Sequence, residues 1–370
     1  MYNKNMSFFS SKNAPVQYRL IIDIEPNSVG WGLVLPESTK LEYVDRLYIA
    51  YDKRPTLKQI QTKLSRVLKD IITNAVPRQL NGGVIASGLC IHASAWSVAE
   101  THVIDLTFPK PVKLEEKLVI ESVRNHRSGA VSNASQSNLE LVYHQVQRVR
   151  LNGYPVEHPW GKIIQNISCD LIEGYVDKEM REFCDDILLS HVPHITHVPE
   201  AFVSAVASNE LELPTKDLLL VHVGGETTEI TYVLNDHIQK TASVPTGISP
   251  IIREVSESVH GDMNLAFSHV ATAARGARIP TKKEQAVIEA EINSWRDAFI
   301  EGVHAVCGDN VPEHIVYFSA FHDMKIVEYM LTTDRITAWS NKQHVLVNIF
   351  GKKTFQHDFM IAAGALYIVK

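Results

Sequence analysis

The chain of 370 residues has a net charge of −6 and a pI near 6.3, with 45% hydrophobic and 21% charged residues. This composition is typical of a folded protein with enough core for two domains, and it excludes a disordered or fibrous chain. Lys and Arg are nowhere dense enough for the basic surface that nucleic acids require. No segment approaches the roughly 20 apolar residues that span a bilayer, so we expect membrane contact only through a partner.

The first elements in chain order follow a short polar start. Residues 1–16 lack the apolar core of a signal peptide, which predicts a flexible tail on a cytoplasmic protein. Two β-branched runs, 18–24 and 29–35, flank turn residues and predict a strand, a turn and a strand. Residues 55–75 have the apolar spacing of one helix face, with Thr56 as the expected N-cap. Residues 83–91 then predict a buried strand.

The middle of the chain alternates between helical and extended patterns. We expect a helix at 114–127, an exposed loop of small polar residues at 128–138, and a strand at 139–151. After a turn at Asn152 and Gly153, a second strand is expected at 162–172 and a helix at 176–189.

The clearest pattern lies at 217–245, where three apolar runs are joined by tight turns and predict an antiparallel meander. Helices are expected at 248–259, 282–306 and 323–331, with a strand at 315–318 between the last two. The apolar run 359–369 lacks a basic face, which favours a core segment over an interfacial helix. The openings near Leu20 and Leu218 repeat the same strand-turn-strand arrangement.

The turn at Gly224 and Gly225 is the strongest candidate for chemistry. A glycine-rich turn between strands exposes backbone N–H groups that can bind phosphate oxygens, and the Thr227 and Thr228 hydroxyls could add donors. Turns of this composition also occur in hairpins that bind nothing, so both interpretations stay open.

Metal and nucleophile chemistry find little support. The cysteines Cys90, Cys169, Cys184 and Cys307 lie far apart in sequence, so buried reduced thiols are expected instead of a zinc or redox site. His191, His194 and His197 recur at every third position, but Pro193 interrupts any regular helix that could align them. No GxSxG elbow surrounds Ser204 or Ser208.

The order of these features resembles the bacterial actin-like proteins of the FtsA and PilM group. Residues 198–207, 218–234 and 244–248 are similar to the FtsA pattern around its second phosphate loop. Residues 152–161 are similar to a motif of the family's inserted 1C subdomain. The resemblance implies a duplicated, two-lobed α/β fold of the actin-like (ribonuclease H-like) type with an inserted SHS2-like 1C subdomain.

The resemblance also implies a nucleotide site. The first phosphate loop corresponds to residues 23–28 and the second to residues 222–228, with Asp23 as the Mg²⁺ ligand. The implied nucleotide-binding set comprises Asp23, Asn27, Ser28, Gly224, Gly225, Thr227, Thr228, Gly247, Ser319 and Ala320. An alternative interpretation makes Asp23 an ordinary turn residue.

Three departures from the family pattern weaken this site. Glu25 replaces the glycine of the first loop, where its carboxylate repels phosphate. His222 replaces the acidic residue of the second loop, and Ser319 with Ala320 replaces the Gly-Gly of the adenosine motif. No residue pair stands out as a base over an attacking water, so we expect no catalytic residue and no efficient hydrolysis. Binding of ATP and Mg²⁺ without turnover stays open.

The implied organisation is a tail (1–16), a first lobe (17–101 and 177–216), an inserted subdomain (102–176), a second lobe (217–343) and a return to the first lobe (344–370). We expect an FtsA-type scaffold of cell division that forms homo-oligomers or filaments and docks protein partners. A PilM-like role in type IV pilus assembly is the alternative, because that role needs no membrane-binding helix. A sugar kinase or exopolyphosphatase-type enzyme is the third hypothesis.

Overall fold

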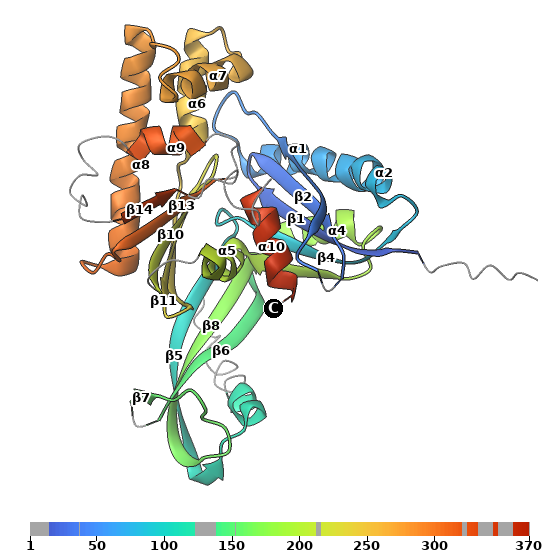
Figure 1. Ribbon diagram of the computed structural model, residues 1–370, viewed down its shortest axis with the longest axis vertical. Coiled ribbons are helices and arrows are strands. Elements are labelled where there is room, and N and C mark those ends of the chain that lie inside the picture. The colour runs from blue at the N-terminus through green and yellow to red at the C-terminus, as the bar shows by residue number, and fades with distance from the viewer. Residues whose placement is uncertain are drawn as a thin grey trace, which may run out of the picture.

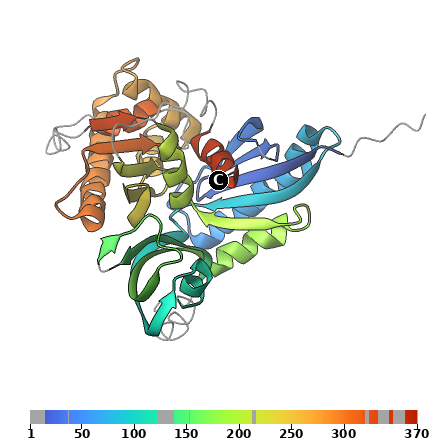
Figure 2. The same ribbon diagram turned by 60° about the horizontal axis from the view of Figure 1, so that its bottom comes forward.

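A five-stranded and a nine-stranded sheet organise the molecule, and five strands of the second repeat the order of the first (Figure 1). The computed structural model describes residues 15–36, 38–122, 138–151, 153–211, 216–319, 324–331, 343–346 and 358–369. Each sheet is the centre of one lobe, and a group of long strands projects away from both (Figure 2). No helix in these described ranges is both long and apolar enough to cross a membrane.

The sheet of the first lobe has the order β3-β2-β1-β4-β9. Its strands are β1 (Gln17–Glu25), β2 (Ser28–Val34), β3 (Leu41–Tyr48), β4 (Val84–His92) and β9 (Ile195–Pro199). The first three form an antiparallel meander, whereas β4 and β9 run parallel to β1. The strand-turn-strand predicted near the start is confirmed, but β3 was not predicted.

Helices cover both faces of this sheet. Successive strand residues point to opposite faces, so both faces carry apolar side chains that the helices bury. Leu20, Ile22 and Ile24 face α1 (Leu57–Asp70), the π-helical turn Ile71–Ala75, α2 (Val76–Leu80) and α4 (Lys178–Leu188). Ile21 faces the other layer, which contains α5 (Glu200–Ser208) and α10 (Phe359–Val369). Thr56 caps α1 in a capping box with Gln59, as predicted.

The sheet of the second lobe repeats the arrangement as β12-β11-β10-β13-β14. Its strands are β10 (Asp217–Val223), β11 (Thr228–Leu234), β12 (His237–Val244), β13 (His314–Phe318) and β14 (Gln343–Leu346). Again three strands form an antiparallel meander and two more run parallel to its first strand. The predicted meander and the predicted duplication are confirmed.

Four helices cover the outer face of the second sheet. They are α6 (Ile248–Ser258), α7 (Met263–Ala274), α8 (Lys282–Cys307) and α9 (Met324–Leu331). Leu219, Val221 and Val223 of β10 pack against these helices, while Leu218 and Leu220 face the first lobe. The sequence predicted α6, α8 and α9, but α7 was not predicted.

The projecting strands are β5 (Ser97–Lys113), β6 (Leu139–Leu151), the short β7 (Tyr154–Pro155) and β8 (Ile163–Asp177). They have their own apolar core and continue the second sheet through β5, which pairs with β12 at Glu100 and Lys240 and bonds to it through the Thr101 and Thr241 hydroxyls. Residues 116–122 are helical, whereas 123–137 and Asn152, which include most of the predicted loop, lie outside the described residues. The strand expected to end at 172 continues to Asp177, whose carboxylate caps α4.

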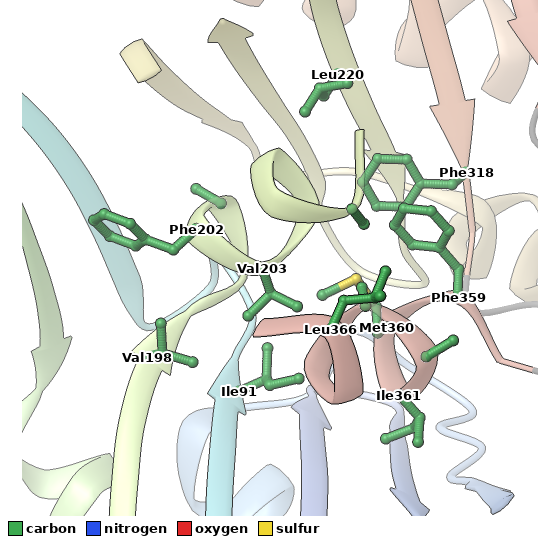
Figure 3. Close-up of a cluster of buried hydrophobic side chains, with 14 of the residues drawn as sticks. Ile91, Val198, Phe202, Val203, Leu220, Phe318, Phe359, Met360, Ile361 and Leu366 are labelled. Atoms are coloured by element: carbon green, nitrogen blue, oxygen red, sulfur yellow. The ribbon is translucent and has the colours of Figure 1, made fainter. Parts of the chain in front are cut away.

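One apolar core joins the two lobes at the base of the cleft between them (Figure 3). Phe202 and Val203 of α5 pack with Phe359 and Leu366 of α10 in this core. Phe318 at the end of β13 packs on Phe359 with the two rings tilted by 31° and their centroids 4.2 Å apart. A short 3-10 turn, Asn209–Leu211, follows α5. The shared core brings the two hairpin turns close together.

Candidate functional site

The first hairpin turn offers few donors to a phosphate. Glu25 pairs directly with Ser28, so Pro26 and Asn27 form a two-residue turn, and proline has no backbone N–H. Tyr51 donates its hydroxyl hydrogen to the Pro26 carbonyl at 3.0 Å, and the Ile49 N–H donates to the Asn27 carbonyl at 2.7 Å. Asp23, Glu25, Asn27 and Ser28 are all buried. Both carbonyl groups of this turn are thus bonded within the protein.

Arg46 of β3 lies across this hairpin as a buried cation. Its side chain is 1% exposed, and its guanidinium is 2.5 Å from Asp23, 3.1 Å from Glu25 and 2.5 Å from Asp358. It also donates to the Ser28 hydroxyl at 2.8 Å. A Cβ atom on Gly30, opposite Arg46 in the sheet, would lie 2.6 Å from the guanidinium, so glycine makes the room for it. We call Asp23, Glu25, Ser28, Arg46 and Asp358 the arginine network.

Charge is unbalanced in the arginine network, where three carboxyl groups surround one guanidinium. Burial is the main cause that raises the pKa of Asp23 to about 7, with Glu25 and Asp358 adding to it against the opposing effect of Arg46. Burial lowers the pKa of Arg46, but Asp358, Asp23 and Glu25 together hold it well above its ordinary value. Arg46 is therefore always charged, and Asp23 holds a proton for part of the time at neutral pH.

The second hairpin turn is closed by α6. The N–H groups of Ile248 and Ser249, in the first turn of that helix, donate to the carbonyls of Gly224 and Gly225 at 3.1 and 2.8 Å. A Cβ atom on Gly247 would lie 2.2 Å from the Gly224 carbonyl oxygen, so only glycine permits this approach. Helix N-termini commonly bind phosphate through such N–H groups. Here these N–H groups bond to carbonyls of the same chain.

The remaining predicted site residues of the second lobe also bond within the protein. The Thr228 hydroxyl donates to the Thr246 carbonyl and accepts from the Trp295 ring N–H, both at 2.9 Å. The Ser319 hydroxyl donates to the Val223 carbonyl at 2.6 Å. Thr227 is half-buried in the turn. Ala320 lies outside the described residues.

The two hairpin turns contact each other directly. A Cβ atom on Gly225 would lie 2.0 Å from the Asn27 side-chain nitrogen, so Asn27 fills the space in front of the second turn. His222 lies between the lobes, with Nε2 3.7 Å from the Glu25 carboxylate and Nδ1 3.0 Å from the Glu200 carboxylate. Its ring stacks on Phe318 at a centroid distance of 5.1 Å. The predicted phosphate position is thus occupied by Glu25 and Asn27.

Two further buried carboxyl groups lie behind His222. Burial raises the pKa of Glu200 and of Glu229 well above the ordinary value, although the hydrogen bond between the two side chains acts oppositely on each of them. Such a bond requires a proton on one of the pair. The Thr231 hydroxyl donates to Glu229 at 3.2 Å. Sequence reasoning had assigned no role to either residue.

The unpartnered polar atoms of the site test its fit to ATP. Asp23 Oδ1, Glu25 Oε2 and Asn27 Oδ1 are buried and have no hydrogen-bond partner among the described residues. All three are oxygens that can only accept when the carboxylates are charged, and a phosphate would bring more acceptors and more negative charge. The residues present therefore do not fit a nucleoside triphosphate. The Arg46 guanidinium also takes the position beside Asp23 that a Mg²⁺ ion would need.

A cavity of about 300 Å³ lies just outside the contact between the hairpin turns. Its lining comes from both lobes, with Tyr48 and Tyr51 on one side and Arg253, Met263 and Phe267 on the other. Arg253 closes part of its rim through a two-pronged ion pair with Glu226 at 2.5 and 3.1 Å. This cavity is an open part of the cleft between the lobes.

No protein-family model matches the sequence, and the search of curated proteins finds no relative. Solved structures are similar in fold. A PilM-PilN type IV pilus biogenesis complex aligns with 95% of this chain and 98% of its own at 13% identity, with a TM-score of 0.61. The ethanolamine utilization protein EutJ from Carboxydothermus hydrogenoformans aligns with 97% of this chain and 92% of its own at 10% identity, with a TM-score of 0.52.

The chain has the two-lobed fold of the actin-like ATPases. The two segments predicted as phosphate loops, 23–28 and 222–228, lie next to each other where the lobes meet. Sequence reasoning did not identify the residues that form ion pairs with and around the first loop. These are Arg46 and Asp358, which lie outside every motif considered. A lone arginine within an otherwise strand-like run, 41–48, was the available signal.

Proposed function

We propose that this actin-like protein is a scaffold that docks protein partners and does not turn over nucleotide. The observation that supports the proposal best is the arginine network, which fills the first phosphate loop with buried, mutually paired charges. A nucleotide could enter only by breaking these pairs, and breaking a buried ion pair costs about 3–5 kcal/mol. We infer that ATP and Mg²⁺ bind weakly or not at all.

A PilM-like role in pilus assembly is the first candidate for the scaffold. The fold similarity to the PilM-PilN complex spans nearly the whole of both chains, and that complex is itself a pair of protein partners. By this proposal the chain works in the cytoplasm and reaches the membrane through a partner. The projecting strands β5, β6 and β8 are the proposed docking or self-assembly surface, because they extend away from both lobes.

An FtsA-like role in cell division is the second candidate. The similarity of residues 140–247 to the FtsA pattern, which includes the inserted 1C motif, favours it. Filament formation follows from this candidate and not from the first. The kinase hypothesis finds no support in the cleft, because Glu200 and Glu229 are buried behind His222.

Thermal unfolding with and without millimolar ATP and Mg²⁺ tests the proposal. We expect the same melting temperature in both conditions, with AMP-PNP giving the same result. A ligand present at 100 times its Kd would stabilise the fold by about 2.7 kcal/mol, which such a measurement detects easily. A clear ATP-dependent shift, or release of phosphate above the blank, would show that the proposal is wrong.

Sedimentation of the full chain separates the two roles. We expect any self-association to be the same with and without ATP, since the cleft does not sense nucleotide. Filaments that form without nucleotide favour the FtsA-like role, and a monomer or small ring favours the PilM-like one. Assembly that requires ATP would contradict the proposed function itself.

A further inference from the structure

A cluster of sulfur and nitrogen side chains lies in the first lobe, separate from the arginine network. Cys90 and His92 lie on the same face of β4, and His197 lies on the neighbouring strand β9 directly opposite Cys90. All three side chains are buried, and one potential ligand atom from each lies within 4.8 Å of the other two. Far apart in sequence, these residues are brought together by the parallel pairing of β4 and β9.

The hydrogen bonds of the two imidazoles leave one nitrogen without a partner. His197 Nε2 lies 2.9 Å from the Asp185 carboxylate, which can only accept, so this nitrogen carries the proton and Nδ1 keeps its lone pair. His197 Nδ1 lies 2.8 Å from His92 Nε2. His92 must therefore donate from Nε2, and its Nδ1, fully buried, has no hydrogen-bond partner in the described residues.

The surroundings resemble those of metal-binding histidines. A metal-bound histidine usually donates its second N–H to a carboxylate, which fixes the ring and its tautomer. Asp185 serves this purpose for His197, and Arg181 in turn holds Asp185 at 2.7 Å. The Cys184 thiol, one residue before Asp185 on α4, lies in the same buried cluster as the Cys90 thiol.

We propose that Cys90, His92 and His197 bind a zinc ion, with the Cys184 thiol as the fourth ligand. A thiolate and imidazole donor set is the one that zinc prefers, at about 2.3 Å to sulfur and about 2.0–2.1 Å to nitrogen. Tetrahedral ligand atoms are then roughly 3.3–3.7 Å apart. The ligand atoms of Cys90, His92 and His197 lie within 4.8 Å of one another, so the ion enters when the two imidazole nitrogens, 2.8 Å apart, separate by about 0.5 Å and the Cys184 thiol moves toward this group.

Zinc binding balances protons and charge as follows. Cys90 and Cys184 lose their thiol protons to solvent and bind as thiolates, because only the thiolate is a zinc ligand. His92 moves its proton from Nε2 to Nδ1, so that the lone pair of Nε2 faces the ion. The two thiolates neutralise Zn²⁺, and the Arg181–Asp185 pair is neutral as well. No unpaired charge is left in the core.

The site joins three segments of the first lobe. His92 ends β4 just before the chain leaves for the projecting strands, Cys184 lies on the helix by which it returns, and His197 precedes α5. The ion would therefore fix the base of the projecting strands on the first lobe. This role is structural and does not depend on the proposed absence of nucleotide turnover.

Metal titration of the full chain tests the proposal. The protein is dialysed against a chelator and titrated with Co²⁺, whose thiolate complexes absorb through sulfur-to-metal charge transfer, and then with Zn²⁺ in competition. We expect one ion per chain, the charge-transfer band, its loss when zinc displaces cobalt, and a higher melting temperature with zinc. A chain that binds no ion, or binds it without the band, would overturn the proposal.

Matched variants assign the ligands. Cys90→Ser and His197→Gln should abolish the band, and Cys184→Ser should weaken it and shift its position. The control Cys169→Ser/Cys307→Ser removes the two thiols that lie elsewhere and should leave the band unchanged. This control keeps the test valid even where Cys90→Ser fails to fold, because a band lost in the control would place the metal at the wrong thiols. His314→Gln, another buried histidine, should likewise have no effect.

Discussion

The two hairpins that face each other across the cleft have the same topology and opposite chemistry. The β1–β2 turn carries Asp23 and Glu25 and holds its shape by ion pairs with Arg46. The β10–β11 turn carries Gly224 and Gly225 and holds its shape by hydrogen bonds to α6. The first uses side chains where the second uses backbone. Each hairpin closes the other, since Asn27 occupies the space that Gly225 leaves.

The two hairpins together form a structural joint between the lobes. The second hairpin has the glycines that a phosphate loop needs, and the first hairpin places the Glu25 carboxylate and the Asn27 amide against them. Glycine at 225 and 247 is now required by contacts within the protein. A residue can therefore match a binding motif while a different contact explains it.

Arg46→Ala should have the largest effect. It removes the only guanidinium of the arginine network and leaves three buried carboxyl groups without a cation, at a cost of about 3–5 kcal/mol. Urea unfolding measures the loss. The matched control is Arg253→Ala on the second hairpin's side, which leaves one carboxylate, that of Glu226, without its cation instead of three, so a smaller loss is expected. Equal losses in the two variants would refute the distinction between the hairpins.

Gly247→Ala should follow, with a loss of about 2–3 kcal/mol in the free energy of unfolding. The added Cβ meets a backbone carbonyl, which cannot move without disturbing the turn. Gly225→Ala provides the contrast, because its Cβ meets the side chain of Asn27. Asn27→Gly should therefore rescue Gly225→Ala and not Gly247→Ala. A double-mutant cycle with no coupling between positions 27 and 225 would show that the two turns do not touch.

Glu25→Gly should restore some affinity for ATP and Mg²⁺. It removes a carboxylate from the phosphate position and leaves Arg46 with a free N–H group, so we expect about a tenfold gain, or about 1.4 kcal/mol, in calorimetric titration. Glu226→Gly is the control, since that carboxylate pairs with Arg253 at the cavity rim. Tight binding by the unmodified chain would mean that Glu25 does not exclude phosphate.

Asp23→Asn should give the smallest effect, visible only in the pH dependence of stability. The pKa of Asp23 is raised in the folded state to about 7, so its contribution is fully present below the unfolded pKa near 3.9 and is lost as the pH rises through 7. The unmodified chain should lose about 1 kcal/mol between pH 6 and 8 that the variant does not lose. Asp236→Asn, in an exposed turn, should keep the slope of the unmodified chain. Equal slopes in all three proteins would place the proton elsewhere.

The sequence predicted the meander, its duplication and most helices because their apolar periods are long and regular. It failed for β3, where Glu42, Asp45 and Arg46 interrupt the apolar strand pattern, although Glu42 and Asp45 are exposed and Arg46 is buried by its ion pairs. It failed for α7 because that helix is weakly amphipathic, with only Ala266, Val270 and Ala271 buried. Hydrophobic periodicity within one element can be read directly from the sequence, so strongly periodic elements are the easiest to predict.

The candidate site was only half predictable for the same reason. Asp23 to Ser28 and His222 to Thr228 are contiguous, so a motif can be recognised. Arg46 and Asp358 are 312 residues apart and meet through tertiary packing. The zinc-ligand cluster is a stronger case, since Cys90 and His197 become neighbours only through sheet pairing. The wide separation of these residues in the sequence argued against a metal site, whereas their proximity in the fold favours one.

The docking of α10 has a consequence for biosynthesis. The first lobe begins at residue 17, yet its sheet is covered by a helix that starts at residue 359, and Arg19 bonds to the carbonyl of Ile368. On the ribosome, β1, β2 and β4 must wait for nearly the entire chain before that face is buried. The second lobe completes most of its core between residues 217 and 331 and can form earlier. A nascent chain will thus expose an apolar sheet face longest at its oldest end, where chaperone binding is expected.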